Sequence, residues 1–287
     1  MLPLDHKEYR LGRTTLVLPR SHQLDQLRQH WPRLQLAIGD LAQEMAHKYP
    51  GFSAIDIGAN VGDTAAIICG RDDVPTLCIE GNPAYWPYLE ENARRIGPHV
   101  VIERSLIGET AGAKPLAICT DPSGTAKLVP ADDGSEIMLR TLDQVLRDHP
   151  RFIRSKLIKL DIDGFDFEII RGAVDLLKVL QPILFYECAP IESGTGGGDG
   201  MECFKMLTEI GYTRFLIWDG YGHYMVHLTA ADFDKFVDLI FYLVSNRRFG
   251  PAVYHYDVCA FPAGDTDLFE AVREQQLEVC LRTDAAP

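Results

Sequence analysis

The segment from Asp56 to Asp63, with the sequence DIGANVGD, has the features of a loop that brings a ligand close to the backbone. It follows an apolar run and precedes a predicted helix over 63–69. Glycine turns admit a ligand closely, and the start of a helix offers unpaired N–H groups. The glycines are spaced G-x-x-x-G, with Asn60 where the dinucleotide-binding pattern G-x-G-x-x-G has its second glycine. The spacing therefore favours a ligand without a pyrophosphate over NAD(P).

Two acidic side chains near this loop suit the two ends of such a ligand. Asp56 comes just before the first glycine and suits an ammonium group. Glu80 ends the next predicted strand, where a carboxylate can accept both hydroxyls of a ribose. We therefore predict S-adenosylmethionine (SAM), with its methionine end near Asp56, Gly58 and Asn60 and its ribose on Glu80. A plain strand–helix turn followed by a surface glutamate is the alternative.

Three carboxylates, Asp161, Asp163 and Glu187, stand at or just beyond the ends of two predicted strands. Ligands of open α/β sheets bind at this edge, so we expect these carboxylates to be catalytic, one of them as the base for an alcohol. Asp161 and Glu187 could instead hold Mg²⁺, which prefers oxygen ligands. Asp163 could also cap the next helix, and Glu187 could be an ordinary strand-end residue. His223 and His255, among tyrosines, are alternative bases, although such histidines are more often packed.

The elements that must position these residues alternate between strand and helix, which predicts a doubly wound, mostly parallel sheet of seven strands in an α/β fold. The strands are expected at 53–57, 75–80, 100–105, 156–161, 182–187, 213–218 and 253–260. The helices are expected at 63–69, 84–96, 165–180 and 200–210, with a further C-terminal helix near 266–277.

Residues 1–50 are predicted to be a helical extension, because apolar residues recur there at helical spacing before Pro50-Gly51 breaks the chain. Residues 51–287 would then form the ligand-binding domain. Two regions interrupt its alternation. Residues 112–143 suggest a β-hairpin insertion, and 219–251 suggest an insertion with a helix and a strand-like run.

The composition narrows the class of partner. The 287 residues carry 28 basic and 41 acidic side chains, a net charge of −13, which disfavours nucleic acid. Seven cysteines without a C-x-x-C motif indicate neither a disulfide framework nor a zinc cluster and favour a reducing compartment. We see no signal region and no long apolar stretch, so we expect a cytoplasmic protein without a membrane span, acting on a small molecule. The oligomeric state is not readable.

Several motifs, taken in order, resemble the FkbM family of SAM-dependent methyltransferases. They are DIGANVGD, then IEGNP at 79–83, RTLD at 140–143, IKLDIDGFD at 158–166, Gly172-Ala173 and the run 182–187. The resemblance covers roughly residues 52–190. It implies a Rossmann-like class I methyltransferase fold and O-methylation of a hydroxyl on a sugar, glycan or polyketide-type metabolite. Family members commonly carry D-x-E-G-x-E where this chain has Asp163 and Asp166, which keeps the charge and shortens the reach.

With this resemblance, we expect the cofactor to contact residues from the ends of the first strands. They are Asp56, Gly58, Asn60, Gly62, Asp63, Thr64, Glu80, Gly81, Asn82, Ser105 and Asp161.

Three other functions are weighed against a small-molecule O-methyltransferase. An NAD(P)-dependent oxidoreductase would need the absent G-x-G-x-x-G. Amino-group methyltransferases tend to carry Asn/Asp-Pro-Pro-Tyr after the fourth strand, where this chain has Asp-Ile-Asp-Gly. A non-catalytic SAM-binding protein would keep the loop without turnover, and the carboxylates argue against it weakly. The identity of the acceptor cannot be derived from the sequence.

Overall fold

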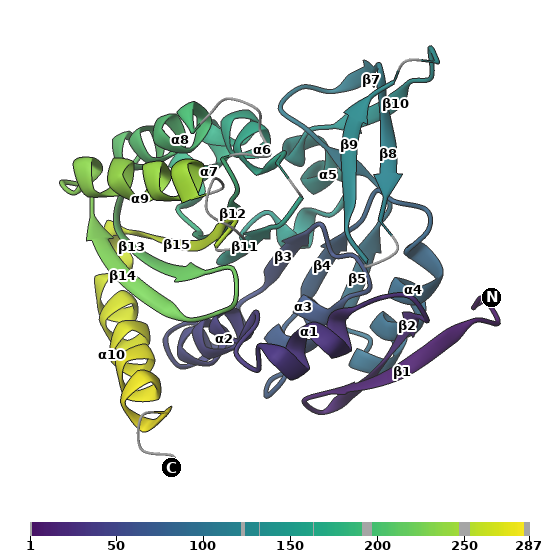
Figure 1. The fold of residues 1–287 in the computed structure, drawn as a ribbon, viewed down its shortest axis with the longest axis horizontal. Coiled ribbons are helices and arrows are strands. Elements are labelled where there is room, and N and C mark those ends of the chain that lie inside the picture. The colour runs from purple at the N-terminus through teal and green to yellow at the C-terminus, as the bar shows by residue number, and fades with distance from the viewer. Residues whose placement is uncertain are drawn as a thin grey trace.

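The computed structural model of the chain describes residues 2–121, 124–131, 133–162, 164–190, 197–246 and 253–283. Within these ranges the main feature is an eight-stranded sheet with the order β14-β13-β15-β12-β11-β3-β4-β5 (Figure 1). Its strands are β3 (Ala54–Ile57), β4 (Thr76–Ile79), β5 (Val100–Glu103), β11 (Leu157–Leu160), β12 (Ile183–Cys188), β13 (Tyr212–Asp219), β14 (Tyr224–Thr229) and β15 (Tyr256–Pro262).

The five strands from β12 to β5 run parallel, and β15, β13 and β14 extend the sheet in antiparallel fashion. This confirms the predicted mostly parallel α/β sheet. The predicted count of seven strands is wrong by one, because β14, in the region predicted as an insertion, pairs with β13. A short turn joins the two, in which the N–H of Gly222 donates to the carbonyl of Asp219 at 2.9 Å. A tight turn of this kind makes an antiparallel edge strand.

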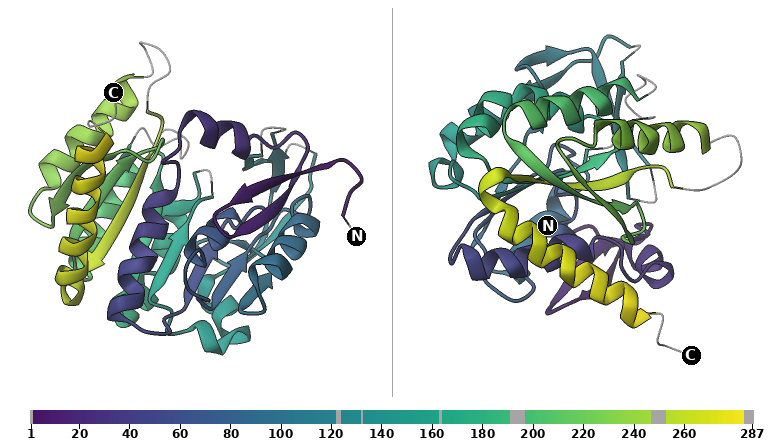
Figure 2. Two further views of the ribbon diagram at one scale, coloured as in Figure 1. Left: turned by 90° about the horizontal axis from the view of Figure 1, so that it is seen from below. Right: turned by 90° about the vertical axis from the view of Figure 1, so that its left-hand side faces the viewer.

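Helices cover both faces of the sheet, as the right-hand view of Figure 2 shows. Successive strand residues point to opposite faces, so Ile55 and Ile57 belong to one apolar core and Ala54 to the other. The first group of helices is α2 (Leu36–Lys48), α3 (Asp63–Ile68), α4 (Trp86–Ile96) and α10 (Thr266–Thr283), which follows η2 (Ala263–Asp265). The opposite group is α5 (Leu142–Asp148), η1 (Pro150–Phe152), α6 (Asp166–Gly172), α7 (Val174–Leu180), α8 (Gly198–Glu209) and α9 (Phe233–Asn246). None of the described helices has the length and apolarity that a bilayer span requires.

The single helix predicted over 165–180 is instead two short helices, α6 and α7, with a break at Ala173. Gly172 lies against the backbone of Glu109, and a Cβ at Gly172 would come within 2.7 Å of the Glu109 Cα. Glycine is a weak helix former, and its missing side chain here admits a neighbouring backbone. Helix α6 therefore ends at the residue that packs against the distant backbone of Glu109.

The N-terminal extension begins with a β-hairpin, β1 (His6–Leu11) and β2 (Thr14–Pro19), which corrects the prediction that residues 1–50 are only helical. The predicted helices follow as α1 (Leu24–His30) and α2. The hairpin is held by a distant side chain: the amide of Asn92 accepts the N–H of Val17 at 2.7 Å and donates to its carbonyl at 2.9 Å. The apolar spacing within residues 1–50 could not predict this hairpin, because the side chain that holds it comes from α4.

Residues 112–143, predicted as a hairpin insertion, contribute to two small sheets (Figure 1). In one, β8 (Leu116–Thr120) pairs antiparallel with β9 (Ala126–Pro130). In the other, β10 (Ile137–Arg140) lies between β6 (Leu106–Ile107) and β7 (Gly112–Lys114). The β8–β9 hairpin is the part that reaches the edge of the central sheet where the predicted site residues lie.

Replacing Gly58 tests how tightly β3 and β11 are joined at that edge. Gly58 has φ +80°, and a Cβ there would lie 2.0 Å from the carbonyl oxygen of Asp161. We expect Gly58→Ala to lower the free energy of unfolding by about 3 kcal/mol, from backbone strain and overpacking together. Urea denaturation measures this loss.

The control is Gly51→Ala, because Gly51 has φ +74° but open space around its Cβ position. It should lose only about 1 kcal/mol, the cost of the left-handed backbone. Equal losses at the two positions would contradict the close contact.

Candidate functional site

Two cavities open at the carboxyl ends of β3, β4 and β11. The narrow cavity has a volume of about 60 Å³, and its walls include Glu80, Asn82, Ile118 and Leu128. The wide cavity has a volume of about 410 Å³, and its walls include Thr64, Glu187, His255, Trp31 and Tyr254. Gly58, Asn60 and Asp161 line both cavities. A ligand that passes these three residues can occupy both spaces.

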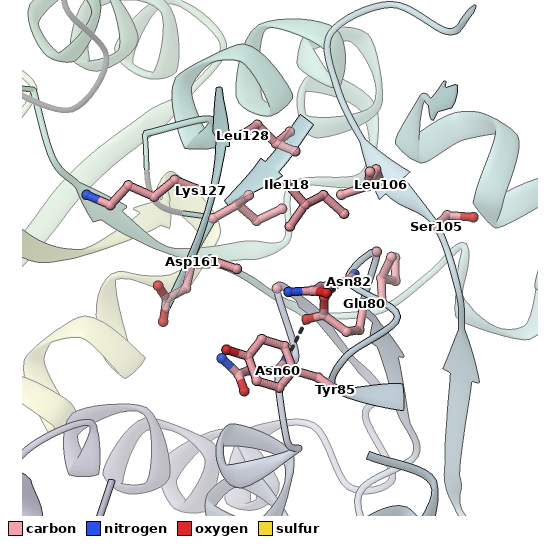
Figure 3. Close-up of a pocket in the computed structure, with 15 residues that line it drawn as sticks. Asn60, Glu80, Asn82, Tyr85, Ser105, Leu106, Ile118, Lys127, Leu128 and Asp161 are labelled. Atoms are coloured by element: carbon pink, nitrogen blue, oxygen red, sulfur yellow. Dashed lines mark hydrogen bonds between the residues drawn. The ribbon is translucent and has the colours of Figure 1, made fainter. Parts of the chain in front are cut away.

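Glu80 is the fixed polar group of the narrow cavity. Its carboxylate accepts the backbone N–H of Asn60 at 2.7 Å and that of Asn82 at 2.6 Å (Figure 3). Burial raises the pKa of Glu80, and these two amides act in the opposite direction. Each carboxylate oxygen has a second lone pair, so Glu80 can still accept hydroxyl hydrogens from a ligand.

The other walls of the narrow cavity are mostly apolar. Figure 3 shows Leu106, Ile118 and Leu128 on the side opposite Glu80 and Tyr85. Ile118 and Leu128 come from the β8–β9 hairpin, which two side chains hold in place. Asn82 Nδ2 donates to Thr120 Oγ1 at 3.0 Å, and Asn60 Nδ2 donates to the carbonyl of Gly124 at 2.7 Å. The hairpin therefore closes the narrow cavity by hydrogen bonds to the two loops that form its floor.

The glycines of the first loop serve the packing of the protein itself. The missing Cβ of Gly58 faces the Asp161 carbonyl, and that of Gly62 faces Leu89 of α4 at 3.0 Å. In the next loop, a Cβ at Gly81 would collide with Leu106. The expectation that these glycines mainly admit a ligand is thus incomplete, because neighbouring protein atoms occupy the space first.

A buried row of charges lies beneath the cavities. The register of β11 and β3 sets Lys159 beside Asp56, and Lys159 Nζ lies 3.3 Å from Asp56 Oδ1 and 3.1 Å from Asp161 Oδ2. Asp56 has no exposed surface, and burial raises its pKa to about 6 despite Lys159. Burial would also raise the pKa of Asp161, but Lys159 and hydrogen bonding with Glu187 hold that pKa below its ordinary value. Asp161 is therefore ionised at neutral pH.

The wide cavity collects acidic groups around one histidine. Glu187 Oε1 lies 3.1 Å from His255 Nδ1, and both residues line the cavity together with Asp161. Asp257, another wall residue, has a pKa raised to about 8, chiefly by burial and then by the charge of Asp161. The cavity can thus offer an oriented imidazole and a carboxylate to the same ligand.

The predicted site residues separate into groups. Gly58, Asn60, Glu80, Gly81, Asn82, Ser105 and Asp161 line the narrow cavity, and Asp63, Thr64 and Glu187 line the wide one. Asp56 and Gly62 line neither cavity. The Ser105 hydroxyl donates to Glu103 and points away from the cavity in Figure 3. Asp163 lies outside the described residues.

The carboxylate after Asp163 turns away from the cavities. Asp166 Oδ2 accepts the backbone N–H of Ile162 at 3.3 Å, and its side chain is buried. Burial, with the charge of Asp161, raises the pKa of Asp166 to about 8. Asp166 therefore acts as a buried support for the loop after β11.

The predicted Mg²⁺ site on Asp161 and Glu187 is not supported. In the described part of the chain, no group of three or more His, Cys, Asp or Glu side chains is arranged to hold a metal ion. The ammonium of Lys159 already neutralises Asp161, and the imidazole of His255 is already paired with Glu187. A nearby cation repels a divalent ion, so the donor set suits proton transfer better than metal binding.

Several residues that line the wide cavity were not predicted as site residues from the sequence. His22 precedes α1, and Trp31 follows α1 and stacks on Tyr221 with ring centroids 4.2 Å apart. These residues are far apart in sequence, and only the fold brings them together. Of the two candidate histidines, His255 lies in the cavity, whereas His223 is exposed, pairs with Asp219 and lines neither cavity.

Removing Lys159 tests the buried charge row. We expect Lys159→Met to lower the free energy of unfolding by about 3–5 kcal/mol at pH 8, because it leaves Asp56 charged, buried and unpaired. Without Lys159 the pKa of Asp56 rises further above 6. A carboxyl whose pKa is raised by folding stabilises at low pH and loses that contribution as pH rises through the folded pKa. The loss should therefore be smaller at pH 5, as urea denaturation at both pH values can measure.

Two further variants provide a control and a test of the explanation. Lys178→Met, at an exposed position on α7, should change stability by no more than about 0.5 kcal/mol. The double variant Asp56→Leu/Lys159→Met should recover part of the loss, since it removes the unpaired charge. A loss that is the same at pH 5 and pH 8 would refute the role assigned to the ion pair.

Comparison with known proteins indicates the same class of protein as the sequence motifs do. The family model described as the methyltransferase FkbM domain matches residues 56–234. No curated protein matches the sequence.

Among solved structures, methyltransferase FkbM from Methylobacillus flagellatus is 14% identical, with a TM-score of 0.40 over 74% of this chain and 44% of that one. The chain thus spans less than half of that protein. TYW2 from P. horikoshii, in complex with MeSAdo, is 12% identical, with a TM-score of 0.45 over 90% of this chain and 72% of that one. An O-methyltransferase from Bacillus cereus, in complex with SAH, is 7% identical, with a TM-score of 0.40 over 78% and 80%.

The family model covers well over half of the chain and includes the glycine loop, Glu80, Lys159, Asp161 and Glu187. The chain belongs to the FkbM methyltransferase family.

Proposed function

We propose that this protein is a SAM-dependent O-methyltransferase that methylates a hydroxyl of a neutral small molecule. One observation carries the proposal: the two cavities share walls. The narrow cavity holds a carboxylate that can bind a ribose, the wide cavity holds a histidine oriented by a carboxylate, and Gly58, Asn60 and Asp161 line both. Methyl transfer requires a donor and an acceptor to meet in line at one carbon, and two joined cavities leave room for one molecule on each side of the shared walls.

The narrow cavity fits the adenosine part of SAM in chemistry. Glu80 can accept the ribose hydroxyls, and Leu106, Ile118 and Leu128 offer an apolar surface for the adenine. When bound, SAM supplies an electrophilic methyl group on a sulfonium. Asp56, which lies beneath the cavities, supports the site through Lys159 and does not contact the ligand directly.

His255 and Glu187 are the groups best placed to take the proton of the acceptor. A neutral His255 that donates from Nδ1 to Glu187 carries its proton-accepting lone pair on Nε2. Asp161, held ionised by Lys159, is a weak base but a strong hydrogen-bond acceptor that can orient the hydroxyl. Asp163, two residues after Asp161, was also predicted as catalytic and remains a candidate catalytic residue.

The charges of the wide cavity favour a neutral acceptor. Its walls carry the acidic residues Asp63, Asp161 and Glu187 against the ammonium of Lys159, while Asp257, with its pKa of about 8, is neutral at pH 7. A phosphate or carboxylate on the acceptor would be repelled. Aromatic and leucine side chains complete the walls and suit the faces of a sugar ring or a polyketide. We therefore favour an uncharged sugar, glycan or polyketide hydroxyl.

Cofactor binding is the first test. S-adenosylhomocysteine (SAH) at a hundred times its Kd should raise the free energy of unfolding by about 2.7 kcal/mol, and NAD should not. Glu80→Gln should weaken SAH binding by about tenfold to a hundredfold, because its amide cannot accept all the bonds that the carboxylate does. Isothermal titration calorimetry and thermal unfolding measure both effects.

The matched control is Glu103→Gln, since Glu103 ends the neighbouring strand β5 and lines neither cavity. It should leave SAH affinity unchanged. If wild type shows no thermal shift at saturating SAH, the proposed function falls.

Turnover is the second test. Transfer of a labelled methyl group from SAM should be seen with some members of a panel of neutral glycosides and polyketide alcohols, and not with their carboxylated or phosphorylated counterparts. His255→Phe should lower kcat by about 10²–10⁴-fold, the range for loss of a general base, and leave SAH affinity intact. His227→Phe, on the exposed surface of β14, is the control and should keep full activity. Full activity in His255→Phe would assign the base elsewhere.

A further inference from the structure

His22 is a buried polar residue at the junction of the two cavities. It lies between β2 and α1, outside the segment 56–234 that the family model matches. The side chain is 7% exposed and lines the wide cavity, and its ring lies 6.3 Å from that of Tyr85, a wall of the narrow cavity. Its Nε2 faces Gly124 closely enough that a Cβ there would lie 2.5 Å away.

The hydrogen bonding of His22 fixes which nitrogen carries the proton. The backbone N–H of Leu24 donates to Nδ1 at 3.2 Å, so Nδ1 is an acceptor and Nε2 carries the hydrogen. Burial lowers the pKa of His22, with Asn60 acting in the opposite direction, so the ring is neutral at pH 7. Nε2 lies close to the Asn60 side chain but makes no hydrogen bond of good geometry among the described residues. A buried donor without an acceptor is costly, which indicates that a ligand supplies one.

Asn60 offers the opposite kind of group beside it. Its Nδ2 is used by the carbonyl of Gly124, and its Oδ1 is buried without a partner in the described structure. The site therefore presents a donor, on His22, and an acceptor, on Asn60, that lie close together without a well-formed bond between them and that a ligand entering between them can use. The end of an amino acid has both matching groups, a carboxylate and an ammonium.

We infer that His22 binds the amino-acid end of the cofactor, with Nε2–H donating to the carboxylate while Asn60 Oδ1 accepts from the ammonium. This inference rests on the proposed function, because it requires SAM in the joined cavities. The backbone N–H of Asn60 already binds Glu80, so the amino-acid end would follow directly after the ribose. The N-terminal segment thus completes the cofactor site that the matched domain begins.

Two ligands that differ only at this end test the inference. SAH carries the amino-acid end, and 5′-methylthioadenosine lacks it. Calorimetry should show that His22→Phe weakens SAH binding by about tenfold to a hundredfold, as expected for a hydrogen bond to a charged group. The affinity for methylthioadenosine should change less than about threefold, and His22→Gln, which keeps a donor, should restore part of the SAH affinity.

The control is His99→Phe, because His99 is half-buried, also has an unpartnered Nε2 and lines neither cavity. It should leave both affinities unchanged. Equal weakening of both ligands by His22→Phe, or no change in either, would overturn the inference and leave His22 a structural residue. If wild type binds neither ligand, the proposed function itself fails.

A measurement on the wild-type protein serves if His22→Phe does not fold. The imidazole Nε2–H signal of His22, assigned by its absence in His22→Gln, should shift and become protected from exchange on addition of SAH. Methylthioadenosine should not produce this change. The same response to both ligands would overturn the inference.

Discussion

The ion pairs of Lys159 are the interaction on which the site depends. Several carboxylates gather at the ends of β3, β11 and β12, and a carboxylate taken out of water without a partner is strongly disfavoured. The ammonium of Lys159, buried in the middle of β11, lies between Asp56 and Asp161 and compensates them. Asp161 can therefore stay ionised beside the wide cavity. The strand register that pairs Lys159 with Asp56 is thus an electrostatic requirement as well as a packing one.

The narrow cavity is built as one unit from three strand ends. The Asp161 carbonyl packs on Gly58, and Glu80 ties the loop after β4 to the loop after β3 through two backbone amides. Asn92 extends this unit, because its side chain also donates to the carbonyl of Val61 while holding the N-terminal hairpin. A change in any one of these contacts would move the others, since all of them share the first loop.

The wide cavity has a different origin. Trp31 comes before the segment that the family model matches, and Tyr254 and His255 come after it. The segment that the family model matches therefore includes the walls of the narrow cavity but only part of the walls of the wide one. Acceptor selection would reside in the N-terminal segment and the late loops, whereas the cofactor loops would remain common to the family.

The sequence alone determined the alternation of strands and helices, because apolar periodicity and glycine turns are local properties. It also determined that Gly58, Asn60, Glu80 and Asp161 would lie at one edge, since the carboxyl ends of parallel strands meet there. The β1–β2 hairpin and the break at Ala173 involve contacts with distant residues, Asn92 and Glu109, whereas a tight turn after β13 adds β14 to the sheet. The tertiary structure alone placed Asp56 beneath the site, paired Glu187 with His255 and brought His22 to Asn60, because each of these depends on strand register or on packing across the chain.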